Sequence, residues 1–231
     1  MHQQDILALR KRAFQYKRKH RLVGLIKRVT TWNDYQIAEV LKHRQDLIRV
    51  TRGIHRRNGD PASSHQQFIQ TSLLLDGWAK DYLMSALAWS HDMKDDYGET
   101  FNYQYNSRHY SPQMALDINR MSRQPHWSYL PFCDEVEHSD VRLRSGGLRT
   151  MVTKMLDRSH NDSNPIKITS PMRRRKSGMK VWQSRNSLLH IAKEIGYMYD
   201  ELLWLTDRQQ KRLGYSNAEL DKLVLQPLDN P

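Results

Sequence analysis

The chain has 231 residues, and its 37 Lys and Arg residues outnumber 25 Asp and Glu residues, which gives a formal net charge of +12. This length favours one domain with extensions over two full domains. No apolar run reaches the roughly 18 residues of a membrane-spanning helix, and the N-terminus lacks an apolar secretory signal, so we expect a cytoplasmic protein with no membrane partner. The single cysteine, Cys133, excludes an internal disulfide and a zinc site built from thiolates.

The positive charge is concentrated in two segments. Residues 1–30 are predicted to be a basic N-terminal extension, ahead of a domain that spans residues 31–231. A second cluster covers residues 173–176, in a stretch rich in Pro, Ser and Gly. Both could bind nucleic acid weakly, but solvated surface is the more ordinary explanation, because no recognised nucleic-acid module accompanies them. The sequence leaves the oligomeric state open.

Apolar residues recur at helical spacing along most of the chain. The predicted helical segments are residues 34–50 (with Asn33 or Asp34 as N-cap), 68–75, 82–89, 112–123, 147–160 and a long or broken helix over 183–212. Alternating strand patterns with hairpin turns are absent, which predicts an all-α domain. Two irregular polar segments, 98–112 and 124–147, are predicted to be long surface loops.

Metal-binding side chains are dispersed along this helical pattern. They are His65, His91, Asp92 and Asp157. Two imidazoles and two carboxylates suit a divalent ion such as Mn²⁺. Successive helical residues point about 100° apart, so the adjacent His91 and Asp92 need a helix end to reach one ion. A further acidic pair, Asp95 and Asp96, lies one helical turn beyond His91, and Asn161 follows Asp157 at the i+4 position of one helix face.

Three segments resemble motifs of the HD-domain hydrolases of the RelA/SpoT type, which include the stand-alone small alarmone hydrolases. Residues 53–65, GIHRRNGDPASSH, resemble the pattern GQxRKxGxPYxxH. Residues 85–99, SALAWSHDMKDDYGE, resemble AALLHDVVEDTxxT, and residues 154–161, KMLDRSHN, resemble KLADRLHN. The similarity extends from about residue 35 to residue 165. It implies an all-α HD-domain metallohydrolase fold.

The resemblance also implies roles for individual residues. His65, His91, Asp92 and Asp157 would hold one Mn²⁺ ion. Catalytic roles fall to Asp95, Asp96 and Asn161, and substrate contacts to Arg56, Arg57, Asn58 and Asn164. The implied reaction is removal of the 3′-pyrophosphate from (p)ppGpp or a related alarmone such as ppApp.

The chain departs from the family motifs at positions that border the nucleotide. Asp95 replaces a glutamate and is one methylene shorter, and residues 61–67, PASSHQQ, replace a segment that reads PYxxHP. The chemistry is therefore better defined than the substrate. Two alternatives stay open: an HD-domain phosphohydrolase of other substrate, such as a nucleotidase or phosphodiesterase, and a basic nucleic-acid-binding or partner-binding protein with a vestigial metal site.

Overall fold

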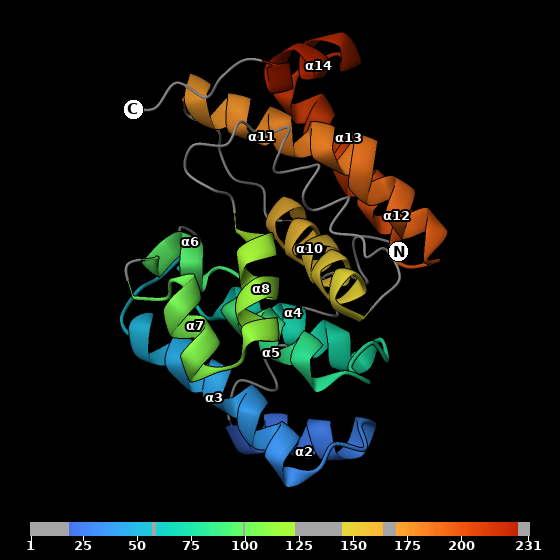
Figure 1. Cartoon of the computed structure of the whole chain (residues 1–231). Helices are drawn as coiled ribbons and strands as arrows, with labels where there is room; N and C mark the ends of the chain where they lie inside the picture. The colour runs from blue at the N-terminus through green and yellow to red at the C-terminus, as the bar shows by residue number, and fades with distance from the viewer. Residues whose placement is uncertain (1–18, 57–58, 99, 123–144, 164–169, 226–231) are drawn as a thin grey trace. The chain divides into compact units, whose positions relative to one another are not determined.

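The computed structural model describes residues 19–56, 59–98, 100–122, 145–163 and 170–225, shown in Figure 1. Within these ranges the secondary structure is helical, and one isolated antiparallel bridge pairs His55 with Pro61. The expected all-α class is confirmed for this part of the chain. None of its helices is long and apolar enough to cross a membrane.

The chain divides after Ser122 into two compact units. The first unit contains α2 (Lys19–Val29), α3 (Asp34–Val50), α4 (Ser64–Leu75), α5 (Tyr82–Ser90), α6 (Met93–Tyr97), α7 (Tyr103–His109) and α8 (Pro112–Met121). The second contains α10 (Ser145–Ser163), α11 (Pro171–Gln183), the π-helical turn η1 (Ser184–Leu188), α12 (Leu189–Glu194), α13 (Tyr199–Leu213) and α14 (Asn217–Leu225).

Helix α5 is the centre of the first unit. It contacts α3, α4 and α8, and every residue from Met84 to Ser90 is buried. The start of α3 is fixed by a capping box, in which the Asn33 side chain accepts from the Gln36 backbone N–H and the Gln36 side chain accepts from the Asn33 backbone N–H. The predicted helix 34–50 and its N-cap are therefore confirmed.

Helix α2 belongs to the first unit although its sequence lies within the segment predicted as an extension. Leu22, Leu25 and Ile26 are at most 1% exposed, and α2 contacts α4. Lys27 and Arg28 remain exposed. The positive charges of this helix thus lie on the face opposite an apolar stripe that stabilises the fold. Residues 1–18 lie outside the described ranges.

The loop predicted over residues 98–112 is wrong, because α7 occupies its centre. The Asn102 side chain caps α7 by accepting a hydrogen bond from the Tyr105 backbone N–H at 3.0 Å. Phe101 is fully buried, and the buried Asn106 amide donates to its carbonyl oxygen at 2.8 Å. The helix is held by hydrogen bonds and aromatic contacts, so its sequence lacks the aliphatic periodicity from which a helix is predicted. The other predicted loop, 124–147, lies outside the described ranges except for the first turn of α10.

The second unit has α13 packed against α10, α11 and α12. Its main core is formed by Met151, Met155, Met179, Leu188, Leu189, Ala192 and Leu202. The sequence predicted a long or a broken helix over residues 183–212, and the helix is broken. The segments η1 and α12 come first, a turn in which Met198 has a φ of 60° follows, and α13 begins after it.

Helix α11 includes the basic cluster at residues 173–176, within the stretch rich in Pro, Ser and Gly. Arg174 donates from Nε and Nη2 to the carbonyl oxygen of Leu213 at 2.8 and 2.6 Å, and thereby caps the C-terminus of α13. At Gly178 a Cβ atom would lie 2.6 Å from Leu223 Cδ1 of α14, so any larger residue would require the neighbouring side chains to shift. One arginine of the basic cluster is therefore a structural residue.

Candidate metal-binding site

Two helix ends in the first unit position His65, His91 and Asp92. His65 is the second residue of α4, and His91 is the C-cap of α5, where its backbone N–H still donates to Leu87. Asp92 follows as the N-cap residue of α6. The chain leaves one helix and enters the next between His91 and Asp92, so both side chains can point toward one centre, as the adjacent pair requires.

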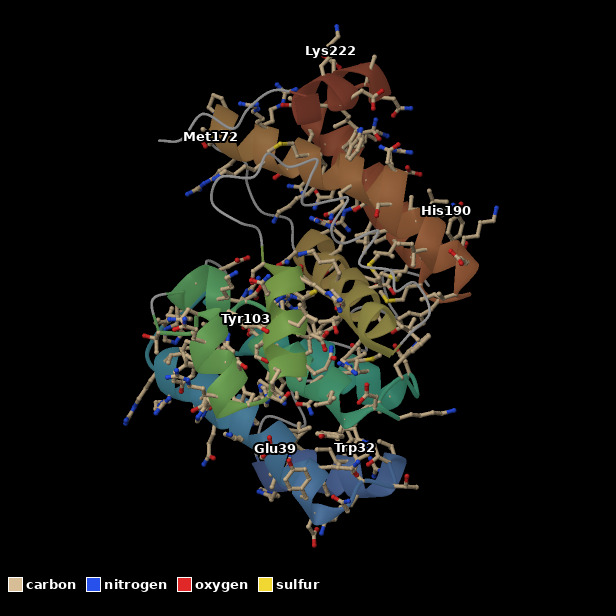
Figure 2. The ribbon with its side chains drawn as sticks, in the orientation of Figure 1. Trp32, Glu39, Tyr103, Met172, His190 and Lys222 are labelled. Atoms are coloured by element: carbon tan, nitrogen blue, oxygen red, sulfur yellow. The ribbon has the colours of Figure 1, made fainter. Side chains whose placement is uncertain are left out.

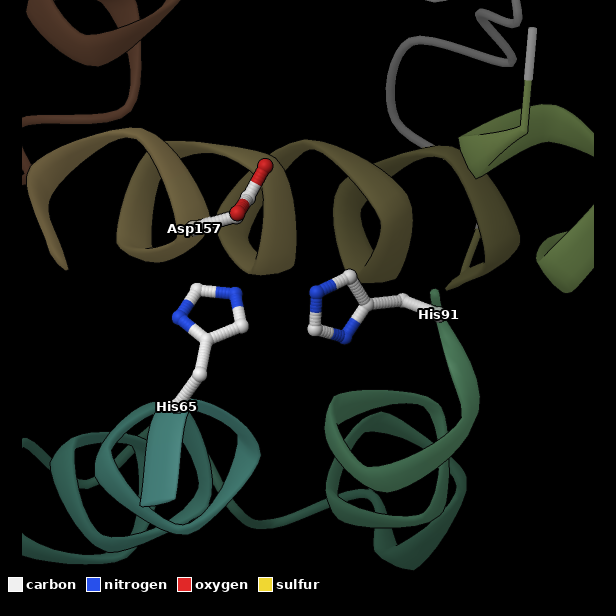
Figure 3. Close-up of side chains that lie close together, drawn as sticks. All are labelled: His65, His91 and Asp157. Carbon is white, nitrogen blue, oxygen red and sulfur yellow. The ribbon is translucent and has the colours of Figure 1, made fainter. Parts of the chain in front are cut away.

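The three side chains converge on one carboxylate oxygen. Asp92 Oδ2 lies 3.1 Å from His91 Nε2 and 3.6 Å from His65 Nε2. The two imidazole rings, drawn in Figure 3, have centroids 5.3 Å apart and an interplanar angle of 62°. Both histidines are at most 2% exposed, whereas the Asp92 side chain is 32% exposed. The cluster therefore combines a dry interior with one side that solvent can reach.

The backbone determines which nitrogen of His91 faces Asp92. His91 Nδ1 lies 3.1 Å from the carbonyl oxygen of Ala88. A carbonyl oxygen only accepts, so this hydrogen bond places a proton on Nδ1 and leaves a lone pair on Nε2 of the neutral ring. That lone pair faces a carboxylate oxygen at 3.1 Å. Two acceptors this close need a proton or a cation near both of them.

A metal ion fits the observed separations. With metal–ligand distances of about 2.1–2.2 Å, neighbouring ligand atoms lie roughly 3.0–3.6 Å apart in octahedral or tetrahedral geometry. The two nitrogen–oxygen separations, 3.1 and 3.6 Å, fall in this range. A proton on Nε2 of His91 would give an imidazolium–carboxylate ion pair at the same distance, and metal-binding measurements separate the two cases.

Sequence reasoning missed Gln66 as a member of this cluster. Its Nε2 donates to Asp92 Oδ2 at 3.0 Å, so the oxygen that faces both imidazoles has a fixed hydrogen-bond donor. Gln66 is 5% exposed. It stands directly after His65, where the family motif has proline, a residue whose side chain cannot donate. The departure from the motif was visible in the sequence, but its hydrogen-bond partner was not.

The acidic pair lies on α6, directly after the cluster. Asp95 and Asp96 are both exposed at the helix surface. The pKa of Asp96 is raised to about 6, because its carboxyl group is partly desolvated and lies near the carboxylates of Asp92 and Asp95, while His91 and Arg56 oppose the shift. A carboxyl group with this pKa can exchange a proton near neutral pH, as a general base requires.

Arg56 lies in a tight turn ahead of α4. Its backbone N–H donates to the Asp60 carbonyl at 2.7 Å, and the Gly59 N–H donates to the Arg56 carbonyl at 2.9 Å. Gly59 has a φ of +84°, which explains why glycine occupies this position. The positive charge of Arg56 acts to lower the pKa of Asp96, so Arg56 lies near the acidic pair. The predicted substrate contacts Arg57, Asn58 and Asn164 lie outside the described residues.

Asp157 and Asn161 are positioned by α10 in the second unit. Asp157 is 7% exposed, and the Asn161 amide donates to its Oδ1. Lys154 Nζ lies 3.3 Å from Asp157 Oδ2. The spacing of three and four residues brings all three side chains to one face of the helix, as the sequence predicts for Asp157 and Asn161. Asp157 is thus a buried carboxylate with an amide and an ammonium group from its own helix.

Comparison with known proteins gives no family for this chain: no protein-family model matches the sequence, and no curated protein matches it. The likeness to HD-domain hydrolases is carried by the three motifs and by the chemistry of the side chains described above. The function is therefore derived from those residues.

Proposed function

We propose that this chain is a metal-dependent phosphohydrolase of the HD-domain fold. In this proposal one divalent ion, Mn²⁺, is held by His65, His91, Asp92 and Asp157. The observation that carries the proposal is the approach of Asp92 Oδ2 to the Nε2 atoms of two buried histidines. Asp157 is assigned to the same ion from its motif and from its buried carboxylate on α10. Mixed nitrogen and oxygen ligands of this kind suit Mn²⁺.

The proposed chemistry is attack of water on phosphorus. A bound divalent ion would lower the pKa of water and neutralise phosphoryl oxygens. Asp96, the carboxylate one turn beyond Asp92 on α6, is assigned to accept the proton of the attacking water. Asp95, the neighbouring carboxylate, orients that water. Asn161 hydrogen-bonds the substrate from the α10 face that also carries Asp157.

The proposed substrate is (p)ppGpp or a related alarmone such as ppApp, from which the 3′-pyrophosphate is removed in the cytoplasm. Such a substrate carries at least four phosphates, so its binding needs cationic side chains near the reacting group. Arg56 supplies one of them, and the proposal assigns further contacts to Arg57, Asn58 and Asn164. The net charge of +12 favours a polyanionic substrate in general.

A hydrolysis screen tests the proposal. Purified full-length protein is incubated with Mn²⁺ and ppGpp, pppGpp, ppApp and a panel of other nucleotides, and the released pyrophosphate or phosphate is measured. We expect ppGpp to give GDP and pyrophosphate. Asp92→Ala should abolish this reaction, whereas Asp34→Ala, which removes a carboxylate that is 95% exposed, should leave it unchanged.

Three outcomes would contradict parts of the proposal. Hydrolysis of a different nucleotide would retain the metal site and reject the alarmone substrate. Equal activity of Asp92→Ala and the wild type would reject the ligand assignment. Inactivity toward the whole panel, together with RNA binding that weakens steeply with salt, would favour the alternative of a basic binding protein.

A further inference from the structure

A polar pocket lies beside α7 in the first unit, apart from the candidate metal site. It has a volume of about 430 Å³. Its lining residues all carry a side-chain hydrogen-bond donor: Thr100, Asn102, Gln104, Tyr105, Arg108 and His109. None of them is acidic. Figure 2 labels Tyr103, the first residue of α7, and this helix supplies Gln104, Tyr105, Arg108 and His109 to the pocket lining. This volume is within the range of small-molecule sites, roughly 300–1,000 Å³.

His109 is held rigidly at this pocket by a carboxylate from α3. Its Nε2 lies 2.9 Å from Asp46 Oδ2, and the Tyr110 hydroxyl donates to the same oxygen at 3.0 Å. Arg49 Nη2 lies 3.1 Å from the other oxygen, Asp46 Oδ1. Lys42 donates to the backbone carbonyl of His109. One of these contacts holds the imidazole ring, two hold the Asp46 carboxylate that the ring faces, and one holds the His109 backbone.

This network leaves one ring nitrogen of His109 for a ligand. The Asp46 carboxylate accepts a hydrogen bond from Nε2, so Nδ1 is the nitrogen that remains for the pocket. The His109 side chain is 35% exposed, in contrast to the 12% exposed Asp46. A buried carboxylate behind a half-exposed imidazole is a common way to present a histidine to a bound molecule.

The remaining donors of the pocket are also partly oriented. Asn102 accepts a hydrogen bond from the Tyr105 backbone N–H through Oδ1, which fixes the orientation of its side chain. The Tyr105 ring is held between Phe101 and His109, with centroid distances of 5.2 and 5.0 Å. Arg108 is exposed, and no acidic side chain in the described part of the chain pairs with it. The pocket thus offers the Arg108 guanidinium group beside three side chains held by the contacts described above, those of Asn102, Tyr105 and His109.

We propose that this pocket binds a small molecule through a phosphate group, with Arg108 donating to the phosphate oxygens and the imidazolium form of His109 donating to them from Nδ1. A guanidinium group forms paired hydrogen bonds with phosphate, and the Gln104 amide can donate to a remaining oxygen. The absence of lining carboxylates removes the repulsion that an anion would otherwise meet. The proposal does not depend on the metal site, because no proposed metal ligand lines this pocket.

Titration with inorganic phosphate tests the pocket. Full-length protein in EDTA at pH 7 is followed by ¹H–¹⁵N NMR as phosphate is added at constant ionic strength. We expect saturable shifts centred on Tyr105, Arg108 and His109. Arg108→Gln should weaken binding about tenfold, since it removes a charge-assisted contact, whereas Arg28→Gln, the same change on an exposed face of α2, should have no effect.

Additional measurements make the result decisive. Acetate at the same ionic strength should bind at least about tenfold more weakly than phosphate, because it has fewer acceptor oxygens and less charge. His109→Gln, checked for folding by circular dichroism, should also weaken phosphate binding. Shifts that map to other residues, equal affinity of Arg108→Gln and Arg28→Gln, or equal affinity for acetate would each overturn the phosphate-site proposal.

Discussion

Replacing Gln66 with Leu tests whether the hydrogen bond to Asp92 shapes a metal site. The substitution keeps the side chain about as large, but it removes the N–H that lies 3.0 Å from Asp92 Oδ2. A hydrogen bond to a charged acceptor is worth about 1.5–3 kcal/mol. Asp92 is 32% exposed, so water replaces part of the lost interaction and the lower end of that range applies. We expect a loss of about 1.5 kcal/mol, or roughly tenfold weaker Mn²⁺ binding.

Gln70→Leu is the matched control for this change. Gln70 lies one turn further along α4 and is fully buried, and neither of its amide atoms has a hydrogen-bond partner among the described residues. The same substitution there should leave Mn²⁺ affinity unchanged, and it should preserve or raise stability because an unsatisfied polar group is removed.

Isothermal titration with Mn²⁺ measures both variants beside the wild type. Thermal unfolding with and without Mn²⁺ gives an independent measure, because an ion that binds only the folded state raises its stability. If Gln66→Leu binds Mn²⁺ as tightly as the wild type, or if Gln70→Leu loses affinity to the same extent, Gln66 does not position a metal ligand. If the wild type itself takes up no Mn²⁺, the His91–Asp92 contact is an ion pair and the metal proposal fails.

Three further predictions follow from the same structure. Asp157→Ala should lose Mn²⁺ binding and turnover together, whereas Asp95→Ala should keep the ion and lose turnover; equal loss of metal in both would contradict these separate roles. Leu25→Ala, in the buried face of α2, should lower the free energy of unfolding by about 3 kcal/mol in denaturant titrations. Burial, aided by nearby positive charge, lowers the pKa of His43 from 6.5 to about 3. The unfolded chain therefore binds an extra proton between these pKa values, and stability should fall by about 2 kcal/mol from pH 7 to pH 5. His43→Phe should remove that part of the pH dependence, and an unchanged pH profile would show that His43 is not its source.

Local signals in the sequence were sufficient for most of the helices. The segment 34–50 has an apolar stripe and a capping box, and both act between residues three or four positions apart. The helix α7 was missed because its stability comes from distant or aromatic partners. His109 and Tyr110 hydrogen-bond to Asp46, more than sixty positions earlier in the chain. Such contacts leave no periodic pattern within the segment itself.

The candidate metal site also depends partly on local sequence and partly on contacts between distant residues. The residue types and their order in the sequence indicated which side chains could bind a metal, because imidazole and carboxylate groups keep their ligand chemistry wherever they lie. The packing of α4 against α5 decided that His65, His91 and Asp92 converge in the first unit. It also brought Gln66 to Asp92, a contact across 26 positions that no local pattern encodes. Ligand chemistry is a property of single residues, whereas distances between ligands depend on how helices pack, and for that reason only the tertiary structure could provide them.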